Sequence, residues 1–297
     1  MKTRMKTIFA CLLLSGLMIP VQAQVQKMKK TIIPFLFILI GVSFQGIGQE
    51  KKASDSTSSS TELTAAEKAA IAANNPLASI KTFNMHNYYN PSLAGLPDET
   101  SNTFWFRYAQ PVGSFLIRAS LPMSSMPTGG QTNTSGLGDL NVFGTYLAVK
   151  NDKTTFGVGP LVVAPTASQE ALGSGKWQGG LALIIFEVLS KQFQVGGLIT
   201  WQASFAGQSD REDTNVMAVQ AIGLWQLGKG TYLRSSAVST FNFESGSYVV
   251  PFGLGIGKVL KAEGLVFNIF AEPQFTVISY GVGQPKIQLF FGLNTQF

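Results

Sequence analysis

The charged side chains that could act on a solute fall inside segments that alternate like β-strands. Arg107 lies between Phe106 and Tyr108, and Arg118 likewise lies between two apolar residues. Such alternation places charged and apolar side chains on opposite faces of a strand. We therefore expect one polar face, whose charges either line the path of a solute or pair with one another in a polar core.

The polar residues that share this face are the expected lining of a barrel lumen. An arginine on the lipid face near the bilayer centre would cost about 2 to 4 kcal/mol. This energetic cost and the two-residue period of the strands both predict that these residues face inward. The candidates are Arg107, Arg118, Asp139, Gln194, Gln202, Arg234, Thr240, Asn242, Asn268, Glu272 and Gln274. A solute path and a barrel filled by paired polar side chains both fit this pattern.

Three other groups could do chemistry, and each has a plainer interpretation. His86 is the only histidine, and no serine partner for a Ser-His hydrolase is identifiable, so a structural or lumen-facing histidine is favoured. The acidic run 210–213 could hold a divalent cation, although a solvated loop tip is the better interpretation. Gly253, Gly255 and Gly257 lack the helix of a phosphate loop and more simply allow a close approach to the strand. We predict no catalytic, metal or cofactor site.

The elements that must position these residues are strands, from residue 79 to the end of the chain. About twelve are expected, an even number, as in single-chain bacterial barrels. They are 79–90, 102–110, 113–121, 136–149, 154–165, 175–189, 191–205, 214–227, 231–243, 247–260, 264–278 and 286–297. The predicted fold is an all-β, antiparallel, up-and-down transmembrane barrel with a short N-terminal periplasmic helix.

The connections between these strands alternate in length. Tight ones are expected at 111–112, 151–153, 190–191, 228–230 and 261–263, and longer polar ones at 90–101, 122–135, 166–174 and 206–213. Short periplasmic turns and long external loops are typical of such barrels, which places both termini in the periplasm. The short connection 244–246 does not fit this alternation.

The last strand, 286–297, has one apolar face and ends on an aromatic residue in phase with that face. Phe291, Leu293 and Phe297 lie on the apolar side, and Gln288 and Asn294 on the other. This ending is similar to the C-terminal signal that outer-membrane barrels present to the barrel assembly machinery. The alternative is an edge strand of a soluble sandwich that happens to end in Phe.

Aromatic residues near the predicted strand ends suit the two membrane interfaces. Trp105, Trp177, Trp201, Phe205 and Phe243 fall near the outer ends, and Trp225 and Phe297 near the inner ends.

Composition and charge exclude other classes of protein. The chain is 45% hydrophobic but only 13% charged, against roughly 25% in soluble domains. Of the 22 Lys and Arg, six precede residue 49, and the remaining 16 balance the 16 Asp and Glu. The net charge of +6 therefore belongs to the N-terminus, and no basic stripe remains for nucleic acid. Cys11, the only cysteine, lies in a targeting segment.

The N-terminal region carries the layout of a secretory signal twice. Residues 1–27 are interpreted as an over-extended start or a first signal, and residues 28–48 as the signal peptide. Residues 49–76 are a solvated linker followed by a short helix that begins near Thr64. That helix could lie in the periplasm or plug the lumen. Residues 77–297 form the barrel.

Several segments resemble the outer-membrane barrel family named after a phenol-degradation pathway. They are 136–139, 164–168, 171–177, 204–207, 210–215 and 250–258, of which Leu172-Gly-Ser-Gly-Lys-Trp177 is the most specific. The resemblance implies an outer-membrane location and passage of small, aromatic or hydrophobic compounds. It supplies no catalytic residues, and it does not name the solute.

We expect a bacterial outer-membrane barrel that passes small solutes by diffusion. Its expected partners are outer-membrane lipids, lipopolysaccharide and the assembly machinery. A structural or surface-interaction barrel remains the alternative, and a membrane enzyme is a weaker one. A continuous water-filled path would favour transport, and a filled lumen would favour the structural role.

Overall fold

The computed structural model describes residues 80–129 and 132–297 of the chain. The expected signal segments, the linker and the short helix near Thr64 lie outside these residues. Among the described residues, no helix is long and apolar enough to cross a membrane. The described elements are β1 (Thr82–Leu93), β2 (Ser101–Val112), β3 (Phe115–Gly129), β4 (Thr132–Leu137), β5 (Leu140–Lys150), β6 (Thr154–Ala164), the 3₁₀ turn η1 (Glu170–Leu172), β7 (Lys176–Val188), β8 (Phe193–Gly207), β9 (Asn215–Gly228), β10 (Thr231–Ser235), β11 (Val238–Asn242), β12 (Tyr248–Gly253), β13 (Gly255–Ala262), β14 (Leu265–Tyr280) and β15 (Pro285–Gln296).

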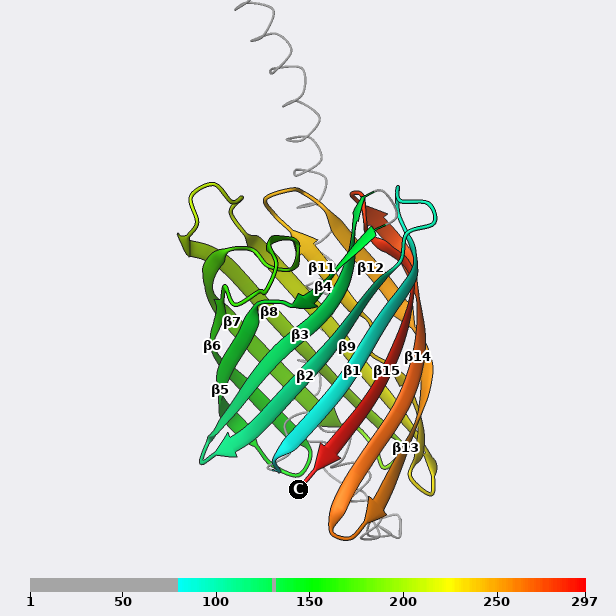
Figure 1. Ribbon diagram of the computed structural model, residues 1–297. Coiled ribbons are helices and arrows are strands. Elements are labelled where there is room, and N and C mark those ends of the chain that lie inside the picture. Colours follow the sequence, from blue (N-terminus) through cyan, green and yellow to red (C-terminus); the bar gives the residue numbers. More distant parts are fainter. Residues whose placement is uncertain (1–79, 130–131) are drawn as a thin grey trace, which may run out of the picture. The chain divides into compact units, whose positions relative to one another are not determined.

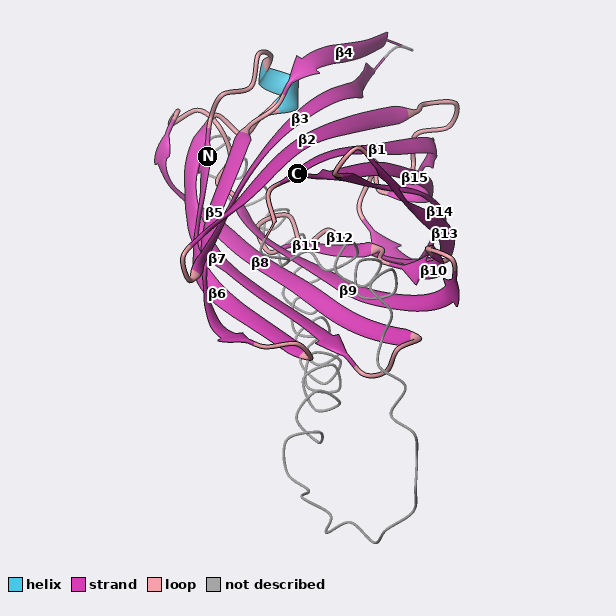
Figure 2. Cartoon of the chain, turned by 90° about the horizontal axis from the view of Figure 1, so that it is seen from below, coloured by secondary structure: helices cyan, strands magenta, loops and turns pink. Residues whose placement is uncertain are grey.

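These strands form one antiparallel sheet that closes on itself. β15 pairs with β14 on one side and with β1 on the other, so the last strand joins the first (Figure 1). Three barrel strands are interrupted: β4 continues into β5, β10 into β11, and β12 into β13. The closed sheet is therefore a barrel of twelve strands, which confirms the predicted fold class. Figure 2 shows the ring that these strands form, seen from one end of the barrel.

The two ends of the barrel differ in their connections. One end, called the turn end, has short connections at 113–114, 151–153, 189–192, 229–230 and 263–264, together with Thr82 and Gln296. The other, called the loop end, has the connections 94–100, 165–175, 208–214, 243–247 and 281–284, and the tip of the β3–β4 hairpin. Lys229 and Gly230 both have positive φ, at 51° and 77°. A two-residue turn of that kind matches the right-handed twist of paired strands.

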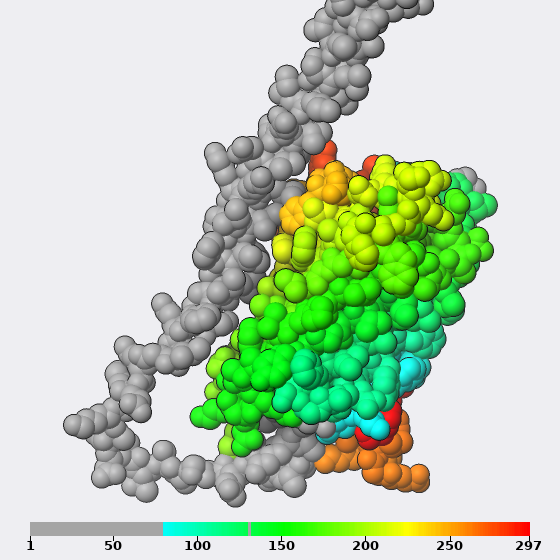
Figure 3. Space-filling view, turned by 90° about the vertical axis from the view of Figure 1, so that its left-hand side faces the viewer, coloured from blue at the N-terminus to red at the C-terminus, as the bar shows by residue number. Residues whose placement is uncertain are grey.

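The outward faces of the strands carry large apolar side chains. Leu181, Phe252 and Val277 have exposed fractions of 55%, 58% and 68%. The face drawn in Figure 3 passes from teal through green to yellow as successive strands cross it. An exposed apolar surface of this extent is unusual for a soluble protein and suits contact with lipid.

The inward faces are divided between apolar packing and polar side chains. At the turn end, buried apolar residues from many strands pack together: Ala109, Leu116, Leu147, Ile184, Phe186, Leu224, Tyr232 and Val259. A second buried group joins Phe143, Leu161, Val163 and Ala182 on β5, β6 and β7. Apolar side chains therefore occupy part of the interior beside β5–β7 and at the turn end, and the polar lumen lies mainly against the other strands.

Candidate functional site

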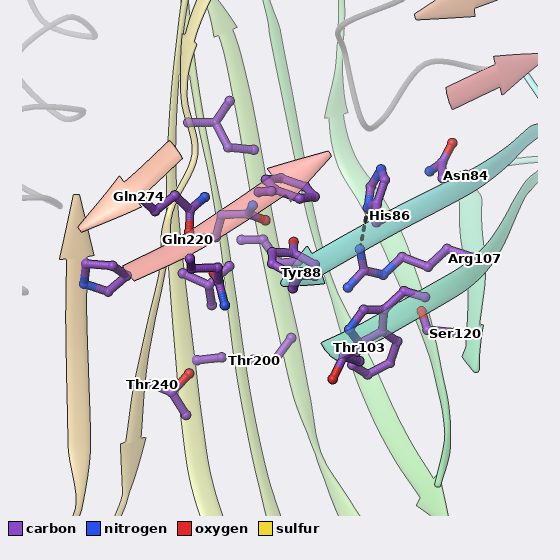
Figure 4. A pocket seen from close by; sticks show the side chains of 18 of the residues that line it. Asn84, His86, Tyr88, Thr103, Arg107, Ser120, Thr200, Gln220, Thr240 and Gln274 are labelled. Atoms are coloured by element: carbon purple, nitrogen blue, oxygen red, sulfur yellow. Dashed lines mark hydrogen bonds between the residues drawn. The ribbon is translucent and has the colours of Figure 1, made fainter. Parts of the chain in front are cut away.

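The barrel interior contains a cavity of about 650 Å³. Its lining runs the length of the barrel, from Gln284 and Pro285 at the loop end to Thr82 and Gln296 at the turn end. Most of the side chains come from β1, β2, β8, β9, β14 and β15, and many are Asn, Gln, Ser or Thr. Figure 4 shows several of them, including His86 and Arg107, pointing into the same space.

The residues predicted to line the lumen lie in several different places. Those that line the large cavity are Arg107, Arg118, Gln202, Arg234, Thr240, Asn268 and Gln274. Gln194 is fully buried and bonds to Gln226, and Glu272 is fully buried beside Arg234. Asn242 accepts hydrogen bonds from the backbone of Glu244 and Ser245 in a loop-end turn. Asp139 lies at the break between β4 and β5.

Arg107 on β2 contacts His86 on the neighbouring strand β1. Its guanidinium donates a hydrogen bond to Nδ1 of His86, drawn as a dashed line in Figure 4. Nε2 of His86 then carries the ring proton, and this N–H donates a hydrogen bond to Oδ1 of Asn294 at 2.7 Å. The Arg107 guanidinium also lies over the ring of Trp105, 4.7 Å from its centre. Both ring nitrogens of His86 are thus occupied, and neither is left for a serine nucleophile.

Arg118 on β3 contacts an aromatic ring, and no described residue forms a hydrogen bond with its guanidinium. Its guanidinium lies 4.3 Å from the centre of the Phe143 ring. Nε of Arg118, like Nε of Arg107, is buried and has no acceptor within the described part of the chain. A guanidinium over a ring face keeps its edge N–H groups available to another acceptor.

Arg234 has a different environment, because it forms a buried ion pair. Nε of Arg234 donates to Oε2 of Glu272 at 2.8 Å, and its guanidinium lies 3.4 Å from the centre of the Phe270 ring. The Glu272 carboxylate also accepts the backbone N–H of Ser236, the Ser236 hydroxyl and the Gln274 amide. Ser236 falls in the break between β10 and β11, so Glu272 supplies an acceptor where the strand is interrupted.

The glycines of β12 and β13 make room for this network and for Tyr232. A side chain at Gly253 would collide with Glu272, and one at Gly257 would collide with the ring of Tyr232. Tyr232 is fully buried, and its hydroxyl donates to Asn268 at 2.6 Å. The glycine pattern therefore serves close packing inside the barrel.

A second cavity, of about 400 Å³, lies under the connection between β6 and β7. Asp139 fixes this connection, because its carboxylate accepts the backbone N–H of Ala167 and both the N–H and the hydroxyl of Ser174. Arg211, from the next loop-end connection, donates to the carbonyl oxygen of Gly173 at 2.6 Å. The connection is thus held from both sides at the loop end.

Within the acidic run 210–213, the carboxylate of Asp213 contacts other residues of the barrel. Asp213 accepts a bond from the Ser204 hydroxyl and pairs with the Lys176 ammonium at 3.2 Å. The Lys176 contact holds the pKa of Asp213 below its ordinary value of 3.8, and the Ser204 bond acts in the same direction. Among the described residues, no three His, Cys, Asp or Glu side chains converge as metal ligands would.

Sequence reasoning missed the aromatic part of the lumen. Tyr88 on β1 stacks on Phe290 of β15 with ring centres 4.2 Å apart, and both line the cavity. The prediction for Trp105 was wrong. This residue was expected at the outer membrane interface, but it lines both cavities. The signal was present, because Trp105 shares the face of Arg107, two residues along the strand. Trp177, Trp201 and Phe205 do lie exposed on the outer wall.

Comparison with known proteins gives a likeness of structure alone. No protein-family model and no curated protein matches the chain. The COG4313 outer membrane channel from Pseudomonas putida F1 is 16% identical, with a TM-score of 0.56 over 74% of this chain and 97% of that chain. The NanC porin is 10% identical with a TM-score of 0.48, over 72% and 98%. The KdgM porin is 7% identical with a TM-score of 0.44, over 73% and 99%. The likeness to the COG4313 channel shows that the described part of the chain shares the β-barrel fold of that protein.

Proposed function

We propose that the protein is a passive channel for small solutes in the bacterial outer membrane. The observation that carries this proposal is the cavity of about 650 Å³, whose lining reaches from the loop end to the turn end of a closed barrel. A polar lining lets water and polar solutes enter, while the closed sheet keeps them apart from lipid.

The different polarity of the outer and inner faces of the barrel wall supports a location in the membrane. Outward side chains are apolar and exposed, whereas cavity-facing ones are largely polar. We place the turn end in the periplasm and the loop end outside, as is usual for bacterial barrels. The outer partners are then lipids and lipopolysaccharide, and the assembly machinery meets the chain through its last strand.

The chain is proposed to be a transporter and not an enzyme. The hydrolase hypothesis required a free ring nitrogen on His86, and both nitrogens are bonded to Arg107 and Asn294. We also infer kinship with the family named after phenol degradation, on the segments 136–139 and 172–177. Passage of small aromatic or hydrophobic compounds belongs to that inference.

A non-transporting structural barrel is the second candidate, and one observation favours it. The buried apolar group that includes Leu116, Phe186 and Leu224 narrows the interior at the turn end. Dewetting at an apolar constriction can stop the passage of ions.

Single-channel recording separates the two candidates. The purified full-length chain, inserted into planar bilayers, is expected to give discrete conductance steps in KCl. Bilayers that contain folded protein, verified by its heat-dependent gel shift, but that show no steps would assign the barrel to the structural candidate.

A further inference from the structure

Arg107 and Arg118 form a pair of cationic groups on one stretch of the lumen wall. In the β2–β3 ladder Arg107 lies opposite Ser120, and Arg118 lies opposite Ala109. The two arginines are therefore diagonal neighbours on the same face of the sheet. The Cα atoms of such neighbours are typically about 7–8 Å apart. Both line the large cavity.

No carboxylate of the described chain neutralises this pair. The ion pairs in which both partners are described residues are Lys176–Asp213, Arg211–Glu170 and Arg234–Glu272, and none of them includes Arg107 or Arg118. The described lining of the large cavity includes three arginines and neither Asp nor Glu. Like charges on adjacent strands repel, so an anion between them would be stabilised by both.

Unused hydrogen-bond donors point to the kind of anion. A guanidinium has five N–H donors in a planar fork that matches the two oxygens of a carboxylate. The buried Nε atoms of Arg107 and Arg118 have no acceptor among the described residues. The Arg107 guanidinium lies over the ring of Trp105 and the Arg118 guanidinium over the ring of Phe143, so each has an aromatic neighbour that helps to position it.

The wall next to this pair is aromatic. Tyr88 and Phe290 stack with an angle of 8° between their rings, and His86 meets Phe290 edge-on at 5.3 Å. His86 is in turn bonded to Arg107, so the ring cluster and the cationic pair are contiguous. A flat apolar group could lie against Tyr88 while its charged end reaches the guanidinium groups.

We propose that Arg107 and Arg118, with the ring of Tyr88 supported from behind by the buried Phe290, form a binding site in the lumen for small organic carboxylates with a flat apolar body. This inference rests on the proposed channel function and names its substrate class. The cavity, of about 650 Å³, falls within the roughly 300–1,000 Å³ of typical small-molecule sites. The same site makes the channel selective for anions.

The test uses benzoate as the probe, with benzamide as its neutral analogue and acetate as the carboxylate without a ring. Isothermal titration calorimetry on the folded full chain in detergent should show that benzoate binds most tightly. Acetate, which lacks the ring, and benzamide, which lacks the charge, should each bind more weakly. The R107Q/R118Q variant should bind benzoate at least about tenfold more weakly, because charge-assisted bonds to the carboxylate are lost. Equal affinity for benzoate and benzamide would overturn the proposal.

Two further variants separate charge from geometry. R107K/R118K keeps the charge but loses the planar fork, so it should keep anion selectivity and bind benzoate more weakly than the wild type. Lys150→Gln removes an exposed charge beside a turn-end connection. This control variant should change neither the anion selectivity nor the affinity for benzoate. If R107Q/R118Q conducts with an unchanged reversal potential in a KCl gradient, the cationic site is refuted and the channel stands.

The binding measurement also separates this proposal from the proposed function. A barrel that binds benzoate through the arginines but gives no conductance steps would refute the channel and keep the site. A barrel that conducts and does not distinguish benzoate from benzamide would keep the channel and refute the site.

Discussion

At the scale of single residues, the three lumen arginines divide into two kinds. Arg234 is bound by the buried carboxylate of Glu272, whereas Arg107 and Arg118 face the cavity over aromatic rings. A buried ion pair holds its members in place, because removal of one partner leaves a charge without compensation. The sequence left open whether these arginines line a path or pair with acids, and the structure contains both arrangements.

The Arg234–Glu272 pair should therefore contribute to stability. Arg234→Gln and Glu272→Gln are each expected to lower the free energy of unfolding by about 3 to 5 kcal/mol. The double variant should lose less than the sum of the two, because no lone charge remains buried. Urea titration of the folded barrel, followed by tryptophan fluorescence, measures all four proteins. Strictly additive losses would show that the pair is not coupled.

At the scale of elements, the loop-end connections are fastened to the strands by charged side chains. Asp139 holds the connection between β6 and β7, and Arg211 reaches the same connection from the one between β8 and β9. Asp213 in that second connection pairs with Lys176 at the start of β7. These contacts order the mouth of the barrel without belonging to its sheet.

The Asp213 contact should make one connection sensitive to acid. Its pKa is lowered in the folded protein, mainly by Lys176, so its contribution is present above the ordinary value of 3.8 and is lost as pH falls below it. The rate of backbone hydrogen exchange in residues 208–214, corrected for intrinsic rates, is expected to be higher at pH 3 than at pH 5. These two values lie about one unit either side of the ordinary pKa. Asp213→Asn should exchange rapidly at both values. A wild-type protein with the same exchange at both would contradict this.

The last strand offers a prediction about assembly. β15 joins β14 to β1 and so closes the barrel, and Phe291 and Phe297 are exposed on its outer face. Deletion of Phe297 should leave export intact but slow assembly, because the assembly machinery is proposed to bind the terminal aromatic residue. The folded fraction in the outer membrane, measured by the heat-dependent gel shift, should fall. Substitution of Phe297 by Tyr keeps an aromatic end and is the matched control.

At the scale of the whole molecule, the lumen is asymmetric along the barrel and around it. The apolar group at the turn end lies beside the arginines, and Leu224 belongs both to this group and to the cavity lining. A solute that enters from the loop end therefore meets polar side chains first and then the apolar group at the turn end, which we expect to be an apolar narrowing of the path. Water drains readily from apolar constrictions, so this narrowing should limit conductance.

Leu224→Ala tests the narrowing. The variant should raise single-channel conductance, and it should lower the free energy of unfolding by about 2 to 5 kcal/mol, since a buried leucine is truncated. Leu181→Ala, on the exposed outer face, is the control and should leave conductance unchanged. If Leu224→Ala conducts like the wild type, the narrowest point of the path lies elsewhere.

Local sequence patterns were enough to predict the barrel and its strand number, and they led us to expect that its polar side chains face inward. Alternation is a local property, since each strand residue faces opposite to its neighbour and a charge on the lipid face is costly. The same parity already placed Trp105 beside Arg107, although its aromatic character alone suggested the membrane interface. Turn residues such as Lys229 and Gly230 fixed the short connections in the same local way.

Which inward-facing residues contact one another depends on how the sheet closes. The partners Arg234 and Glu272 are 38 positions apart, and Tyr88 and Phe290 come from opposite ends of the described chain. Closure of the sheet sets these distances, and no local pattern records which residues of distant strands share a level. That closure pairs Arg234 with Glu272 and leaves Arg107 and Arg118 without a described carboxylate partner, because two opposite charges form an ion pair only where they lie at the same level of the barrel.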